Sequence, residues 1–288
     1  MKMTILTDKT IMHNTLKRYS VIALAAITLA ACKTQPQTVK ESADNFKARI
    51  TQQNVDATMW FNTSAEAHYI FLQTYNYATE RLNMAVTKSA DGKPTAIIVD
   101  LDETVLDNSP YQLRRIVEGE GYSEGSWNEW VNSASAKALP GALEFALHCQ
   151  NRGVEIFYIS NRSEELLIPT LANLKNLGFP FADEDHVYLK VGDESDKSFR
   201  RERVESTYNV LLYLGDNLRD FREDFVERRA DFGKDLTTQL STEMFERYIL
   251  FPNPMYGQWE VPYAAGDSEE EANKKASLIE QLSTEEGE

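Results

Sequence analysis

Cysteine and basic residues are both scarce in this 288-residue sequence. Two cysteines, Cys32 and Cys149, are too few for a disulfide framework or for a zinc site built of cysteines. The 45 acidic residues outnumber the 30 basic ones and give a formal net charge of −15. A protein that binds a nucleic acid polymer by neutralising its phosphates needs the opposite sign, so that class is excluded. An anionic ligand would need a local binding site.

Long apolar runs are also missing, apart from one near the start of the chain. Val21 to Ala31 is apolar except for Thr28, and these 11 residues are too few for a membrane-spanning helix, which needs roughly 20. Lys17 and Arg18 precede the run and small residues end it, which is typical of a secretory signal peptide, here residues 1–31. The alternative is a soluble secreted protein with a chance cysteine at the cleavage point.

The apolar run ends in Leu29-Ala30-Ala31-Cys32, which resembles the bacterial lipobox, whose cysteine is lipidated and becomes the first mature residue. Lys33 after this cysteine resembles lipoproteins sorted to the outer membrane. We therefore expect a lipid anchor at Cys32 in the outer membrane, outside the cytoplasm, with residues 32–44 as a polar tether. The leader carries a net charge of +3, so the mature chain carries −18.

Four short apolar runs rich in β-branched residues alternate with helical patterns along the rest of the chain. This alternation predicts an α/β fold with a parallel sheet flanked by helices, in one domain over residues 45–265. One or two helices precede the first strand, and residues 107–139 form an insertion after it. Residues 266–288 form an acidic tail. The predicted strands are 96–99, 155–159, 187–189 and 210–214, and the helices between them are 141–151, 164–177 (weakened by Pro169) and 198–208.

Polar residues follow each predicted strand, and in an open parallel sheet ligands bind at the carboxyl ends of the strands. These residues are Asp100 and Asp102, Ser160 and Asn161, Lys197, and Asp216 and Asp220. If strand geometry persists, the first two aspartates point the same way, and a third carboxylate would complete a site of oxygen ligands that suits Mg²⁺. An EF-hand is excluded because its glycine is missing. A plain acidic turn remains the alternative.

The segments that contain these strand-end residues resemble the signatures of a known family. The segment Ile98-Val99-Asp100-Leu101-Asp102-Glu103-Thr104-Val105-Leu106 resembles the first signature of the class C bacterial acid phosphatases of the lipoprotein e type, in the haloacid dehalogenase superfamily. The segment from Gly215 to Phe221 resembles the second signature, with Arg219 where an acidic residue is common. Residues 157–162 and 251–259 also resemble segments of this family. The resemblance implies a Rossmann-like sheet with a small, mostly helical cap at about residues 107–139.

The resemblance also implies roles for the polar residues at the strand ends. Asp100 would attack the phosphorus of a phosphomonoester, although a carboxylate and a dianion ~4 Å apart repel by roughly 8 kcal/mol at an effective dielectric of 20. Mg²⁺, held by Asp100, the backbone carbonyl of Asp102 and Asp216, would screen this approach. Asp102 would act as general acid and base, and Asp220 would orient metal-bound water or Lys197.

The phosphate itself would be bound by Ser160, Asn161 and Lys197. Ser160 and Asn161 are expected at a helix N-terminus, where Asn161 can also form a capping box with Glu164. Lys197 lies in the charged run 193–203, where most lysines are solvated, and the resemblance makes it a phosphate clamp.

Two aromatic residues outside this core suggest the substrate. In the family, an aromatic pair at positions like Trp127 and Tyr256 holds a nucleobase, although ordinary aromatic packing is the alternative. The prediction is a Mg²⁺-dependent acid phosphatase, or 5′-nucleotidase, that acts on nucleoside 5′-monophosphates and related phosphomonoesters. A lipoprotein that binds haem or a nucleotide without turnover, and transfer of phosphoryl groups between alcohols, are the alternatives; a homodimer stays open.

Overall fold

The computed structural model describes residues 54–88, 92–228, 231–240 and 242–263, and three short stretches between 270 and 278. The contacts divide the chain into Met1–Ser42 and Ala43–Glu288, and every described residue belongs to the second unit. The predicted leader, Cys32 and the tether 32–44 lie outside the described residues, as does most of the acidic tail. Within the described ranges, every helix is too short or too polar to cross a membrane.

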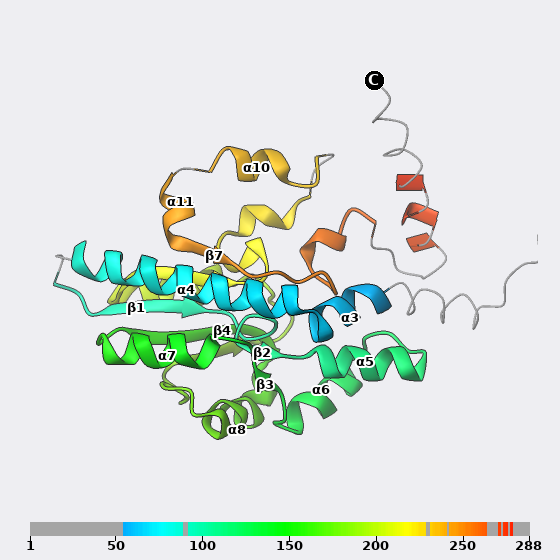
Figure 1. Ribbon diagram of the computed structural model, residues 1–288, viewed down its shortest axis with the longest axis horizontal. Coiled ribbons are helices and arrows are strands. Elements are labelled where there is room, and N and C mark those ends of the chain that lie inside the picture. The colour runs from blue at the N-terminus through cyan, green and yellow to red at the C-terminus, as the bar shows by residue number, and fades with distance from the viewer. Residues whose placement is uncertain are drawn as a thin grey trace, which may run out of the picture. The chain divides into compact units, whose positions relative to one another are not determined.

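A sheet of five parallel strands forms the centre of the fold (Figure 1). The strand order is β5-β4-β1-β6-β7, with β1 in the middle. Both faces of these strands are covered, which explains their near-continuous apolar sequences. The bounds are β1 Thr95–Val99, β4 Glu155–Ser163, β5 Val187–Lys190, β6 Asn209–Gly215 and β7 Tyr248–Leu250. The first four confirm the predicted strands, and β7 is a fifth that the sequence pattern did not indicate.

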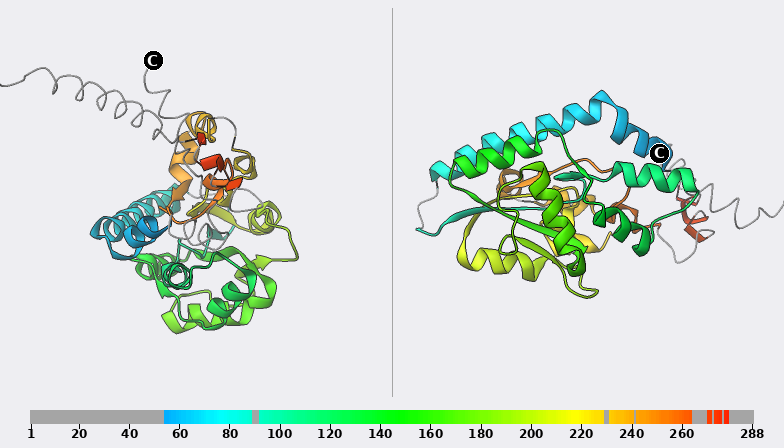
Figure 2. Two further views of the ribbon diagram at one scale, coloured as in Figure 1. Left: turned by 90° about the vertical axis from the view of Figure 1, so that its right-hand side faces the viewer. Right: turned by 90° about the horizontal axis from the view of Figure 1, so that it is seen from below.

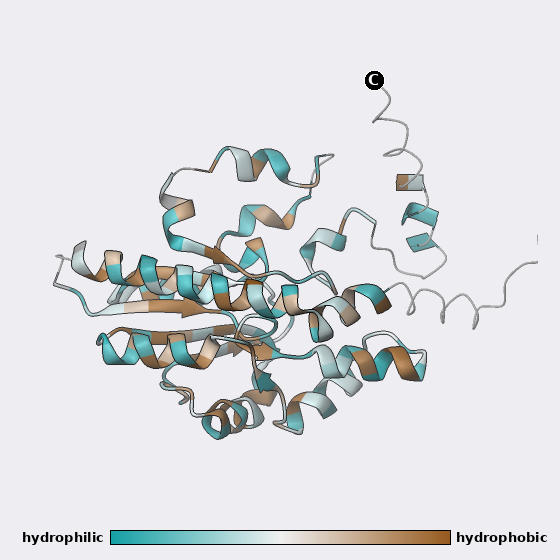
Figure 3. Cartoon of the chain, in the orientation of Figure 1, coloured by the Kyte–Doolittle hydropathy of each residue, from teal (hydrophilic) through white to brown (hydrophobic). Residues whose placement is uncertain are grey.

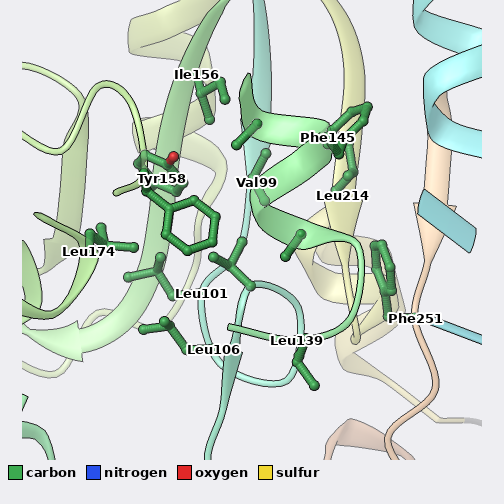
Figure 4. Packing of buried hydrophobic residues seen from close by; sticks show 14 of the residues in the cluster. Val99, Leu101, Leu106, Leu139, Phe145, Ile156, Tyr158, Leu174, Leu214 and Phe251 are labelled. Carbon is green, nitrogen blue, oxygen red and sulfur yellow. The ribbon is translucent and has the colours of Figure 1, made fainter. Parts of the chain in front are cut away.

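Helices cover both faces of the sheet. The helices α4 (Ala65–Lys88) and α7 (Ala142–Asn151) lie on one face and α9 (Ser198–Thr207) on the other, as the right-hand view of Figure 2 shows. Alternate side chains of β1 pack on opposite faces of the sheet, because successive side chains of a strand point in opposite directions. Ile97 and Val99 pack in the cluster beneath α4 and α7, and Ile98 packs in the cluster beneath α9. Figure 4 shows part of the larger cluster.

The first helical stretch consists of two helices. The helix α3 (Val55–Thr63) is followed by Ser64, whose hydroxyl accepts a 3.0 Å hydrogen bond from the backbone of Ala67 in the first turn of α4. The predicted helix at 164–177 is a 3₁₀ turn, η1 (Glu164–Leu166), followed by α8 (Leu167–Leu177). Pro169 does not weaken α8, because it lies in the first turn, where its missing N–H has no helical partner to lose.

The insertion between β1 and α7 is mostly helical, in agreement with the expected cap. It contains α5 (Ser109–Glu118) and α6 (Glu124–Asn132). Two short strands, β2 (Leu106–Asp107) and β3 (Lys137–Ala138), pair in antiparallel fashion at its base.

The chain between β6 and β7 and the segment after β7 consist of short helices. They are η2 (Leu218–Asp220), η3 (Glu223–Val226), α10 (Lys234–Thr238), α11 (Thr242–Arg247) and η4 (Gln258–Glu260). Figure 3 shows apolar residues along the strands and polar residues over much of the helices.

Candidate active site

Three carboxylates meet at the carboxyl end of the sheet. Asp100 follows β1, Asp216 follows β6 and Asp220 lies in η2, and one oxygen of each lies within 4.8 Å of the others. The first two come together because β1 and β6 are adjacent strands; the backbone N–H of Asp100 donates a 2.9 Å hydrogen bond to the carbonyl of Leu214. Carboxylate oxygens are the ligands that hard divalent cations prefer, so the donor set fits such an ion.

Asp220 reaches this cluster because the chain turns back sharply after β6. Its carboxylate accepts a 3.0 Å hydrogen bond from the backbone of Asn217, whose own side chain accepts one from the backbone of Arg219. The Asp220 side chain then lies against Gly215, where an added Cβ would stand only 2.3 Å from a carboxylate oxygen. Glycine at position 215 is therefore required for the turn.

Lys197 lies among these carboxylates, at the residue before α9. It is 5% exposed, and its ammonium group donates hydrogen bonds to Asp100 and, at 2.7 Å, to Asp220. Lys197 is thus buried and paired, unlike the solvated lysines that its charged surroundings suggested. Burial alone would lower its pKa, but the two carboxylates outweigh this and raise the pKa above its ordinary value.

Two of these carboxyl groups, those of Asp100 and Asp216, have raised pKa values because ionised groups lose hydration when buried. Burial raises the pKa of Asp100 to about 7, although Lys197 opposes the shift. Burial and the charges of Asp220 and Asp100 raise the pKa of Asp216 well above its usual range. Asn253 opposes that shift by donating a 2.7 Å hydrogen bond to Asp216. A divalent cation would favour the ionised forms, so this environment also fits a bound metal.

The carboxylate of Asp102 is not a member of this group of three, although it lines the same cavity. The sequence predicts that Asp100 and Asp102 point the same way if strand geometry persists, and it does not persist: β1 ends at Val99 and the chain turns, with Glu103 at φ 60°. The Asp102 carboxylate instead accepts a 2.7 Å hydrogen bond from Nη2 of Arg162. Arg162 is a residue whose importance the sequence reasoning missed, although it belongs to the segment 157–162 on which the family resemblance rests.

Ser160 and Asn161 lie inside β4, and the following helix begins only at Glu164. The predicted helix N-terminus at these residues is therefore wrong, because the strand continues past them to Ser163. The capping box is wrong too: the Asn161 amide donates to the carbonyl of Ser195 and accepts from Arg200. Ser160 is buried and donates a 3.2 Å hydrogen bond to Asp102.

A cavity of about 700 Å³ opens over the four aspartates, Lys197 and Asn161, whereas the buried Ser160 is not part of its lining. Trp127 and Tyr256 also line it, at the side formed by the cap and by the segment after β7. The Trp127 ring makes an edge contact with Tyr111, with ring centroids 5.2 Å apart. The predicted residues that line the cavity are Asp100, Asp102, Trp127, Asn161, Lys197, Asp216, Asp220 and Tyr256.

Arg219 takes no part in the carboxylate cluster. Its guanidinium group pairs with Glu223 and donates a 3.3 Å hydrogen bond to the hydroxyl of Ser195. The departure from the family's usual acidic residue therefore joins neighbouring loops and leaves the three carboxylates as they are.

Comparisons with known proteins show the family and the fold to which this site belongs. A family model described as HAD superfamily, subfamily IIIB (acid phosphatase), matches residues 17–259. A class C acid phosphatase from Bacillus anthracis with tungstate bound has a TM-score of 0.72 and 38% identity, over 80% of this chain and 97% of that chain. Another structure of the class C acid phosphatase from that organism has the same TM-score and coverage and 37% identity.

A curated relative extends the comparison to plants. "Acid phosphatase 1" of Solanum lycopersicum is 30% identical over 159 residues, which are 55% of this chain and 57% of that protein. The chain spans little more than half the length of the curated relatives it matches.

Proposed function

This chain belongs to the acid phosphatases of the HAD superfamily, subfamily IIIB, and from this membership we propose that it hydrolyses small phosphomonoesters with the help of Mg²⁺. The observation that carries the proposal is the buried Lys197 among three carboxylates, at the bottom of a cavity that a fourth carboxylate also lines. A lysine at that place can clamp a phosphate, and the carboxylates can supply a nucleophile and hold a cation. The tungstate bound to the Bacillus anthracis relative is an oxyanion, and it supports an oxyanion site in the same fold.

In the proposed reaction the carboxylates of Asp100 and Asp102 have different roles. An oxygen of Asp100 attacks the phosphorus, and as the new P–O bond forms, the bond to the leaving oxygen breaks. That oxygen takes a proton from Asp102 and departs as the alcohol. Water, giving a proton to Asp102, then attacks the aspartyl-phosphate; inorganic phosphate leaves and the Asp100 carboxylate is restored.

Asp100, Asp216 and the backbone carbonyl of Asp102 are the proposed ligands of Mg²⁺, with Asp220 supporting Lys197 or a ligand water. When bound, the ion would screen the charge of the phosphate from that of the carboxylates. Asp220 already accepts a hydrogen bond from Lys197, so it can hold the lysine in place. Ser160 and Asn161 are proposed phosphate contacts. Ser160 is buried beside Asp102, so its contact requires the hydroxyl to be shared between Asp102 and the phosphate.

Nucleoside 5′-monophosphates are the proposed substrate class, since Trp127 and Tyr256 line the same cavity as the carboxylates. Stacking of a base on an aromatic ring contributes roughly 1–3 kcal/mol and tolerates different bases. Trp127→Ala and Tyr256→Ala should each raise KM for AMP by about 5-fold to 150-fold. Glycerol phosphate, which carries no base, is the control, and its KM should stay within about twofold. Equal increases for both substrates would contradict the stacking role.

A lipid on Cys32 and residence in the outer membrane are proposed from the leader alone. Cys32→Ser should release the protein from the membrane fraction of the cells that make it. A variant that stays in that fraction would contradict the lipid anchor.

Release of inorganic phosphate from AMP by the purified protein in Mg²⁺ tests the proposed activity. Asp100→Asn should abolish this release, and exhaustive chelation should do the same until Mg²⁺ is restored. Binding of AMP without phosphate release by the native protein would favour the alternative, a binding lipoprotein without turnover. Transfer of phosphate to an added nucleoside would favour phosphoryl transfer between alcohols.

A further inference from the structure

The two oxygens of the Asp102 carboxylate have different hydrogen-bond partners. Oδ1 accepts from Arg162 Nη2 at 2.7 Å, from Arg162 Nε at 3.1 Å and from Asn108 Nδ2 at 2.9 Å. Oδ2 accepts from Arg162 Nε at 3.2 Å and from the Ser160 hydroxyl at 3.2 Å. The stronger contacts therefore converge on Oδ1.

This asymmetry decides where a proton on Asp102 can lie. Guanidinium and amide N–H groups only donate hydrogen bonds, so a proton on Oδ1 would face donors from Arg162 and Asn108 and find no acceptor. A hydroxyl group both donates and accepts, so the Ser160 hydroxyl can rotate to accommodate a proton on Oδ2. A proton on Asp102 is thus better accommodated on Oδ2 than on Oδ1.

Arg162 is fixed from several sides. Its side chain is 1% exposed, and its Nη1 donates a 3.2 Å hydrogen bond to the hydroxyl of Thr170 in α8. The centre of its guanidinium group lies 5.7 Å from the centroid of the Trp127 ring in the cap. A guanidinium group presents its donors in a rigid fork, so an anchored arginine fixes the orientation of the carboxylate that it binds.

The second donor to Oδ1 is also fixed. Trp130 donates a 2.8 Å hydrogen bond from its indole N–H to Oδ1 of Asn108. This contact determines which end of the Asn108 amide is the donor, and it turns Nδ2 toward Asp102. Asn108 is fully buried, so water does not compete for these groups.

We propose that Arg162 is a positioning residue for proton transfer by Asp102: its shorter hydrogen bonds hold Oδ1, so that Oδ2 carries the proton, and it acts on the reaction through Asp102. The proposal rests on the proposed phosphatase function. As the P–O bond to the leaving oxygen breaks, its electron pair goes to that oxygen, which takes the proton from Oδ2; Asp102 becomes the carboxylate that Arg162 holds.

If Arg162 positions Asp102 for proton transfer, the effect of replacing it should depend on the basicity of the leaving oxygen. A poor leaving group such as the ribose oxygen of AMP needs the proton, whereas p-nitrophenolate leaves readily without it. Phenyl phosphate and p-nitrophenyl phosphate have nearly the same shape and differ in the basicity of the oxygen that departs, so they form a matched pair. The ratio kcat/KM reports the steps up to the departure of the leaving group.

Arg162→Met and Arg162→Lys, assayed with Mg²⁺, should lose at least about tenfold more kcat/KM on AMP and phenyl phosphate than on p-nitrophenyl phosphate. Lysine keeps the charge but lacks the fork, so it should not restore the loss. The inhibition constant of inorganic phosphate should stay within about threefold if Arg162, which also lines the cavity, acts on Asp102 alone; a larger change would show that Arg162 binds the phosphate itself. Activity on p-nitrophenyl phosphate serves as the check that each variant is folded.

A double-mutant cycle with Asp102→Asn completes the test. Arg162→Met should cause no further loss on AMP, within about twofold, once Asp102 has been replaced, since it acts through that residue. Equal losses on all three substrates, recovery with lysine, or a multiplicative loss in the double variant would each overturn the proposal. If the native protein hydrolyses none of the substrates, the proposed function itself fails, and that result is distinct from the others.

Discussion

Replacing Asp216 with asparagine should stabilise the metal-free protein while weakening its response to Mg²⁺. Asp216 lies within 4.8 Å of two other carboxylates, measured between oxygens. Lys197 donates its hydrogen bonds to those two, Asp100 and Asp220, whereas Asp216 receives the amide of Asn253. The charge of Asp216 is therefore the least compensated of the three.

The size of the effect follows from Coulomb's law. At 4.8 Å or less and an effective dielectric of 20, each neighbouring carboxylate repels Asp216 by about 3.5 kcal/mol or more. The charge of Lys197 offsets roughly one of these repulsions, which leaves about 3–4 kcal/mol against full ionisation. Uptake of a proton by Asp216 relieves part of this, so we expect the variant to gain about 1–3 kcal/mol in the free energy of unfolding at pH 8. The melting temperature should rise by about 2–10 °C.

The stability gained by Asp216→Asn must depend on pH, because only the native carboxyl group can ionise. The pKa of Asp216 is raised in the folded protein, so the folded state disfavours its ionisation. Below the ordinary pKa of 3.8 the group is protonated in both states, and the variant gains nothing. The native protein loses stability relative to the variant as pH rises above that value, and the loss continues until Asp216 is fully ionised in the folded state.

Thermal unfolding followed by circular dichroism in EDTA, from pH 4 to pH 8, measures this difference. Added Mg²⁺ should stabilise the native protein more than the variant, by about 2.7 kcal/mol at one hundred times the dissociation constant if the variant fails to bind. Asp193→Asn, at an exposed residue, is the matched control and should change stability by less than about 0.5 kcal/mol. The reasoning is refuted if Asp216→Asn melts at or below the native temperature in EDTA at pH 8, or if the difference is independent of pH.

Three further substitutions test other parts of the structure. Lys197→Met should lower kcat for p-nitrophenyl phosphate by about 10²–10³, as loss of a preorganised charge does, and a change below threefold would contradict its role as a clamp. His186→Gln should lower the melting temperature more at pH 5.5 than at pH 9. Burial lowers the pKa of His186, but hydrogen bonds with Asp183 and Glu155 outweigh burial and raise the pKa. The stabilisation that the protonated ring gives is therefore complete below pH 6.5 and is lost as pH rises through the raised pKa. Equal losses at both pH values would show that the ring only packs. Tyr75→Phe removes a buried 2.5 Å hydrogen bond to the turn after β1 and should cost about 1–3 kcal/mol in urea unfolding, whereas a neutral result would mean that the turn does not need it.

The sheet could be predicted from the sequence because its central strands are buried on both faces. The strands β1, β4 and β6 each contain a continuous apolar run of four or five residues, which is too short for a buried helix. The strand β7 could not be predicted in this way. It has three residues, pairs with β6 at the edge of the sheet and leaves Leu250 half exposed. Its short apolar run, 248–251, directly follows the helix α11, so the pattern alone does not separate it from the end of that helix.

The position of each site residue was easier to predict than the direction of its side chain. The strand ends bring Asp100 and Asp216 together because parallel strands end at the same edge of the sheet. The direction of Asp102 depends on a turn in which Glu103, a residue other than glycine, has a left-handed conformation, and no local pattern indicates this. The burial of Lys197 depends on partners far along the chain, so its charged neighbours in sequence were misleading.

The order of strands in the sheet has a consequence for how the protein acquires its site. The middle strand β1 pairs with β4 and β6, both distant in sequence, and Asp216 is held by Asn253, which follows β7 at the far edge. Contacts of such long range form late in folding, because a large loop must close before each is made. A growing chain that has not yet released residue 253 from the ribosome therefore lacks part of the site. We expect tight metal binding to report that synthesis and folding of the sheet are complete.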